Sequence, residues 1–109
     1  KPAFNHDSKI ESCSIILDNP ISNTTFDNWL DTLIGVKGSD ILRIKGIVFL
    51  ENIEAPFVFH GVQHVFDPPV QLKNWPKKDR QSRIVVIARN LSQFQLQRSL
   101  DMLRIQTND

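Results

Sequence analysis

The sequence predicts a two-layer α+β domain, in which two helices cover one face of a four-stranded, mainly antiparallel sheet. Four apolar segments have the character of strands, and two segments have apolar residues at helical spacing. Their order along the chain is strand, helix, strand, strand, strand, helix. Each helix carries a single apolar stripe, which can be buried against one face of a single sheet.

The first strand and the first helix are separated by residues that favour a turn. Residues 9–17, KIESCSIIL, contain β-branched side chains in partial alternation, and residues 18–20, Asp-Asn-Pro, end the strand. Asn23 or Thr24 can cap the helix, and Gly35 and Gly38 offer stops at its end. Its apolar stripe, at i, i+3, i+4, i+7 and i+8, comprises Phe26, Trp29, Leu30, Leu33 and Ile34.

The next strand, residues 41–50, has two different faces. Alternation with period two gives one apolar face and one face that mixes cations with apolar side chains. We expect Leu42, Ile44, Val48 and Leu50 on the first face, and Arg43, Lys45, Ile47 and Phe49 on the second. A short connection at 52–55 then predicts a hairpin with a strand at 56–66, which the prolines at 68 and 69 end.

The last strand, residues 82–89, reads SRIVVIAR and is the most continuously apolar segment, so we expect it to be central. Asn90 or Ser92 caps a final helix that extends to about Leu103. The domain is therefore expected to span residues 9–105. Residues 1–8 are expected to form a linker or disordered terminus, and residues 106–109 a disordered tail.

Length and charge exclude several classes of function. The 109 residues suit one domain, and a net charge of +1 gives no electrostatic case for binding nucleic acid or an anionic membrane. No segment approaches the roughly 20 apolar residues that span a bilayer. A single cysteine, Cys13, excludes an internal disulfide and fits a reducing compartment. We therefore expect a cytoplasmic protein whose partners are neither nucleic acid nor membrane.

The signatures of catalysis are missing from this chain. It has no GxxxxGK[ST] loop, and the four glycines, at positions 35, 38, 46 and 61, are too scattered to hold a phosphate. It also has no GxGxxG or GxSxG motif, and its carboxylates form no evident pair. We therefore expect no catalytic residues and no cofactor in this chain.

Four residues are weak candidates for binding a metal. His60 and His64, in HGVQH, would lie about 13 Å apart in a regular strand, which is too far to share one ion unless a bulge or turn at Gly61 brings them together. The favoured interpretation is that each histidine donates to a nearby backbone carbonyl. Cys13 is expected to be a small core residue, and His6, with Asp7, would need further ligands upstream.

Several segments together resemble the C-terminal domain of the CobW family. They are ILRIKGIVFL (41–50), HGVQHVFDPP (60–69) and SRIVVIARNL (82–91). Further matching features occur in the family's order: His6-Asp7, Phe26 with Trp29-Leu30, Trp75 and Arg80. The sequence departs from the family pattern at Ala88, where glycine is usual. The histidine-rich linker is also reduced to His6 and Asp7.

The resemblance implies an accessory domain of a cytoplasmic P-loop GTPase linked to metal delivery. Such proteins serve cobalt insertion in cobalamin synthesis, zinc allocation and nitrile hydratase activation. GTP, Mg²⁺ and zinc or cobalt would then belong to the parent protein, and its partners would be the N-terminal GTPase domain and a metal-dependent client. The phosphate loop and the CxCC-type metal motif of the family lie in that domain and match no position here.

Two functional hypotheses therefore remain. In the first, the domain docks on the GTPase half and helps to recognise the client, and its interface lies on the mixed face of the sheet. The interface residues would be Arg43, Lys45, Phe49, Arg83 and Arg89. In the second, the domain is an independent, ferredoxin-like module whose sheet face binds a peptide or a small molecule.

Overall fold

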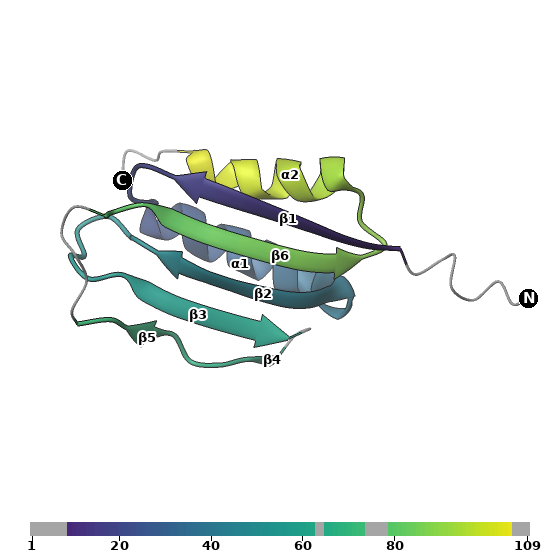
Figure 1. Cartoon of the computed structure of the whole chain (residues 1–109), viewed down its shortest axis with the longest axis horizontal. Helices are drawn as coiled ribbons and strands as arrows, with labels where there is room; N and C mark the ends of the chain where they lie inside the picture. The colour runs from purple at the N-terminus through teal and green to yellow at the C-terminus, as the bar shows by residue number, and fades with distance from the viewer. Residues whose placement is uncertain (1–8, 63–64, 74–78, 106–109) are drawn as a thin grey trace, which may run out of the picture.

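The computed structural model describes residues 9–62, 65–73 and 79–105, which form a two-layer α+β domain (Figure 1). The helices are α1 (Asn23–Lys37) and α2 (Gln93–Asp101), and each is followed by a 3₁₀ turn, η2 (Gly38–Asp40) or η3 (Met102–Arg104). The strands are β1 (Ile10–Leu17), β2 (Ile41–Val48), β3 (Phe57–Val62), β4 (Val65–Phe66), β5 (Val70–Gln71) and β6 (Ser82–Arg89).

The sheet has the strand order β1-β6-β2-β3-β4, with β5 also paired to β3, and its strand pairs are antiparallel. β6 lies between β1 and β2, which confirms the expectation that it is central. Both helices lie on the same side of the sheet (Figure 1). The opposite side carries no helix among the described residues.

The hydrophobic core lies between the helices and the sheet. Alternation along β6 directs Ser82, Ile84, Val86 and Ala88 inward, and each is at most 1% exposed. From the helices, Trp29, Leu33, Leu96 and Leu100 complete this layer. The period-two and period-3.6 patterns in the sequence therefore point to the same buried surface.

Each helix begins at a serine cap. Ser92 forms a capping box with Gln95 at the start of α2, as the sequence allowed. At α1 the cap is Ser22, whose side-chain oxygen accepts from the backbone N–H of Thr25, so neither Asn23 nor Thr24 has this role. No helix in the described part of the chain is long and apolar enough to cross a membrane.

The strand predicted at 56–66 is wrong in extent. The chain reverses after Val62, so that β4 pairs antiparallel with β3, with Val62 opposite Val65. β5 pairs with the other end of β3 through Val58 and Val70. The two short strands add to the four that the sequence predicted and form an edge of the sheet.

A bulge in β2 also changes one predicted face. Ile41 lies opposite Ala88 and Arg43 lies opposite Ile87, which leaves Leu42 as the additional residue. Ile41 therefore joins the core, 1% exposed, whereas Leu42 is only partly buried. From Arg43 onward the predicted alternation of β2 holds.

Candidate functional site

The candidate site is the open face of the sheet, the side opposite to the helices. The strand register sets the cations of β2 and β6 beside apolar residues: Arg43 lies opposite Ile87, Lys45 opposite Val85, and Ile47 opposite Arg83. On the other side of β6, Ile16 lies opposite Arg83, and Ile10 lies opposite Arg89. We define the open face by Ile10, Ile16, Arg43, Lys45, Ile47, Val58, His60, Val62, Val70, Arg83, Val85, Ile87 and Arg89.

Four of the eight large apolar side chains that are exposed among the described residues lie on this face. Ile10 is 60% exposed, Ile16 is 55% exposed, Val62 is 48% exposed and Val70 is 60% exposed. The sequence analysis did not assign these four residues to the site. The parity of Ile10 and Ile16 along the first strand is a signal that could have placed them there, whereas Val70 joins the face only through its pairing with Val58.

The structure divides the four predicted cations into two pairs with different surroundings. Arg83 lies 3.3 Å from Asp79, and Arg89 lies 3.6 Å from Asp40 while its guanidinium also donates to the backbone carbonyl of Ser39. Arg43 and Lys45 are both exposed and have no ion pair or hydrogen bond from their side chains to other described residues. The two β2 cations are therefore the ones available to an incoming carboxylate.

Phe49, which the sequence placed at the interface, is buried and therefore not accessible to a partner. β2 ends at Val48, and Phe49 is 0% exposed. Its backbone N–H donates to the Ser82 hydroxyl, and the guanidinium of Arg80 lies 4.9 Å from the centre of its ring. Val48 lies in the core cluster and Leu50 packs against it, whereas Phe49 is outside that cluster. The predicted alternation therefore continues to Leu50, and the ring of Phe49 is buried apart from the core beneath Arg80.

The metal-ligand candidates do not come together in the described residues. His60 Nδ1 lies 3.5 Å from an oxygen of Asp67, and its Nε2 has no hydrogen-bond partner there, so its neighbour is a carboxylate rather than the expected carbonyl. Cys13 is buried and its thiol donates to the side chain of Gln97. His6, Asp7 and His64 lie outside the described residues.

No group of three or more His, Cys, Asp or Glu side chains that could hold a metal ion occurs among the described residues. With one imidazole beside one carboxylate, these residues do not make a metal centre. The distinctive feature of the open face is the combination of apolar side chains with Arg43 and Lys45, two cations without a partner among the described residues.

Comparison with known proteins identifies the fold and the family. The structure is similar to the Zn(II)-bound YjiA GTPase from E. coli, with a TM-score of 0.76 and 22% identity, and to a Zn(II)-bound triple mutant of that GTPase with the same values. Each match covers 88% of this chain but only 30% of the GTPase chain. Comparison with curated proteins gives no significant match. The family model for the cobalamin synthesis protein CobW C-terminal domain matches residues 10–104, and the chain therefore belongs to that family.

Proposed function

We propose that this chain is the accessory domain of a CobW-like, GTP-dependent metal chaperone, and that it contributes domain docking and client recognition rather than catalysis. Membership of the CobW C-terminal family and the likeness to part of a Zn(II)-bound GTPase support this proposal. In the parent protein, GTP, Mg²⁺ and the delivered metal, zinc or cobalt, are assigned to the N-terminal GTPase domain. Cobalamin synthesis is one process that such a protein would serve in the cytoplasm.

The observation that carries the docking proposal is the open face itself. A sheet buries its apolar side chains against another layer, and here only one side is covered by the helices. Apolar residues that are about half exposed stand on the uncovered side, and patches of this kind mark interaction sites. The GTPase half of the parent is the partner that the family context supplies, so we assign this face to it.

The cations of the open face indicate the chemistry expected of the facing surface of the GTPase domain. Arg43 and Lys45 project from a strand that lies within the sheet, beside apolar residues of β6. Covering unpaired cations with an apolar surface costs several kcal/mol, whereas covering them with carboxylates satisfies them. We therefore expect the facing surface of the GTPase domain to be apolar with acidic groups opposite these two side chains.

The test is made in the full-length parent protein with Arg43→Glu and Lys45→Glu combined. Reversal of both charges is expected to weaken the domain contact, seen as faster hydrogen exchange in β2 and β6 and as a change in GTP turnover. Inter-domain contacts are modest in area and movable, so loss of two charge pairs is sufficient to shift them. Arg98→Glu, which reverses a charge on the helix side, is the matched control and should leave exchange in the sheet unchanged.

Two outcomes would contradict the proposal. Unchanged exchange and turnover in the Arg43→Glu, Lys45→Glu protein would remove the open face from the interface. A parent sequence without a phosphate-binding loop upstream of Lys1 would favour the independent, ferredoxin-like binding module for a peptide or a small molecule. In the first case the GTPase domain would contact another surface of this domain, and in the second case client recognition would have to be sought without reference to a GTPase.

A further inference from the structure

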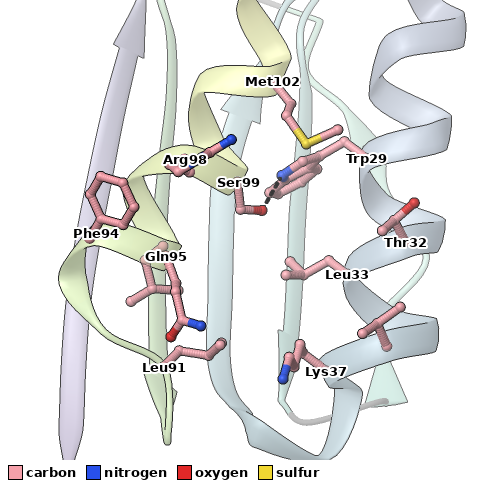
Figure 2. Close-up of a pocket in the computed structure, with 12 residues that line it drawn as sticks. Trp29, Thr32, Leu33, Lys37, Leu91, Phe94, Gln95, Arg98, Ser99 and Met102 are labelled. Carbon is pink, nitrogen blue, oxygen red and sulfur yellow. Dashed lines mark hydrogen bonds between the residues drawn. The ribbon is translucent and has the colours of Figure 1, made fainter.

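A second apolar surface lies on the other side of the molecule, between the two helices. It is a groove of about 470 Å³ that receives side chains from α1, from the Leu91 turn and from α2 with its 3₁₀ extension. Trp29 and Met102 lie at one end, and Leu91 and Lys37 at the other (Figure 2). A hollow of this size suits a few apolar side chains.

The floor of the groove has no polar group that a ligand must satisfy. Leu33, Leu91 and Leu96 are buried there, and the indole N–H of Trp29 already donates to the Ser99 hydroxyl at 3.1 Å, as the dashed line in Figure 2 shows. Apolar side chains can therefore enter without breaking a protein hydrogen bond. At the rim, Val36 is 69% exposed and Met102 is 48% exposed.

The charges at the groove have a single sign. Of the described residues that line it, Lys37 and Arg98 are the charged ones, and neither forms an ion pair within the described part of the chain. Arg98 lies instead over the ring of Phe94, 5.7 Å from its centre. Elsewhere on the helix side, by contrast, Arg104 is paired with Asp101 at 3.4 Å. The groove therefore offers two cations beside an apolar floor.

We propose that this groove binds an amphipathic helix of a partner protein, one whose apolar stripe is flanked by Glu or Asp. A groove between two helices accepts the apolar face of a third helix, with side chains at i, i+3, i+4 and i+7 as anchors. The unpaired Lys37 and Arg98 select carboxylates at the flanks of that helix. The proposal is independent of the docking proposal, because it concerns the opposite surface of the domain.

The test is a selection from a displayed library of helical peptides with fixed apolar anchors and flanking positions randomised among Glu, Gln and Lys. Peptides retained by the chain are expected to carry Glu in excess over Lys at these positions. Their affinity should fall by about tenfold or more in a Val36→Ser, Met102→Ser variant, because two of the exposed apolar side chains of the groove are lost. Ile16→Ser, which removes an exposed apolar side chain of the open face, is the matched control and should bind as the unaltered chain does.

Charge reversal separates recognition of carboxylates from simple apolar adhesion. With Lys37→Glu and Arg98→Glu combined, the same selection should yield peptides enriched in Lys. Four outcomes would overturn the proposal: no retained peptide that depends on Val36 and Met102; no preference for acidic flanks; self-association of the chain through Met102, seen by sedimentation; or protection of the groove by the GTPase half in the parent, seen by hydrogen exchange. The last two would assign the groove to a second copy or to the docking contact.

Discussion

The two faces of the central strand β6 share the neighbouring strands β1 and β2, but their side chains differ in polarity and exposure. On the face toward the helices, Ile84, Val86 and Ala88 are at most 1% exposed, and the one polar side chain, Ser82, accepts the backbone N–H of Phe49. On the open face, the Arg83 and Arg89 side chains remain 41% and 39% exposed beside Val85 and Ile87. The covered face admits polar groups only when they are satisfied, whereas the open face keeps cations among apolar side chains.

This difference separates the residues that stabilise the domain, on the covered face, from the residues that can contact a partner, on the open face. Truncation on the covered face leaves a cavity and removes apolar burial, so it should lower the free energy of unfolding. Changes on the open face remove contacts with water or with partly exposed neighbours, so they should alter stability little. Variants on the two faces can therefore test the assignment of each residue.

The largest effect is expected at Phe49, which the sequence placed at the interface but which is fully buried. Phe49→Ala should lower the free energy of unfolding by about 3–5 kcal/mol, because a fully buried ring is lost. Its contact with Arg80 is lost as well. Ile16→Ala, at a side chain that is 55% exposed, should cost less than about 1 kcal/mol. Urea denaturation measures both costs; equal costs would contradict the burial of Phe49 and return it to the candidate interface.

A smaller effect is expected where β2 approaches β6 and β3 most closely. A Cβ added at Gly46 would lie 2.8 Å from the backbone oxygen of Arg83 and 3.0 Å from side-chain atoms of Ile84 and Phe59. Gly46→Ala should therefore destabilise the domain by about 1–3 kcal/mol through overpacking.

Gly35, in α1, is the matched control for this substitution. An added Cβ there meets nothing within 4 Å. Gly35→Ala should raise the free energy of unfolding by about 0.5–1 kcal/mol through helix propensity. Thermal or urea denaturation of the two variants should give opposite signs. If Gly46→Ala left the free energy of unfolding unchanged, β2 would be shown to separate from β6 and β3 enough to admit a methyl group. The close approach of these strands would then not require glycine at position 46.

Sequence patterns predicted the parts of the fold that depend on local periodicity. The apolar stripe of α1, the alternation of β1 and β6, and the central position of β6 all follow from spacing within one segment. Leu42 was misplaced because a bulge interrupts the alternation, and the bulge is not marked by glycine or proline. The burial of Phe49 was missed because it depends on a residue far away in sequence, Arg80. The reversal after Val62 was missed because apolar residues stand on both sides of it, Phe57 to Phe59 before and Val65 and Phe66 after, so the segment was predicted as one strand.

The candidate site could be predicted only in part, because only some of its features depend on spacing within one segment. Parity alone placed Arg43, Lys45, Arg83 and Arg89 on one face, and the strand register agrees. Which of these cations has a partner depends on residues far apart in sequence, such as Asp40 beside Arg89. The groove between the helices likewise joins side chains about 70 positions apart, Trp29 and Ser99, so spacing within either helix cannot reveal it.

The smallest effect is expected from the two kinds of cation on the open face. Arg89 is bound to Asp40 with both side chains partly exposed, 39% and 26%, so solvent screens the pair. Arg89→Gln should lower the free energy of unfolding by about 0.5–1 kcal/mol, and added salt should reduce this cost. Arg43→Gln, at a side chain with no ion-pair partner among the described residues, should change stability by less than about 0.5 kcal/mol.

A double-mutant cycle of Arg89→Gln and Asp40→Asn isolates the interaction between these two residues from their contacts with the rest of the domain. Coupling of about 0.5 kcal/mol or more would show that Arg89 is held within the domain, which leaves Arg43 and Lys45 to meet a partner. Zero coupling would make Arg89 as available as Arg43. The facing surface of the GTPase domain would then need acidic groups opposite β6 as well as β2, and charge reversal at Arg89 should weaken docking as strongly as reversal at Arg43.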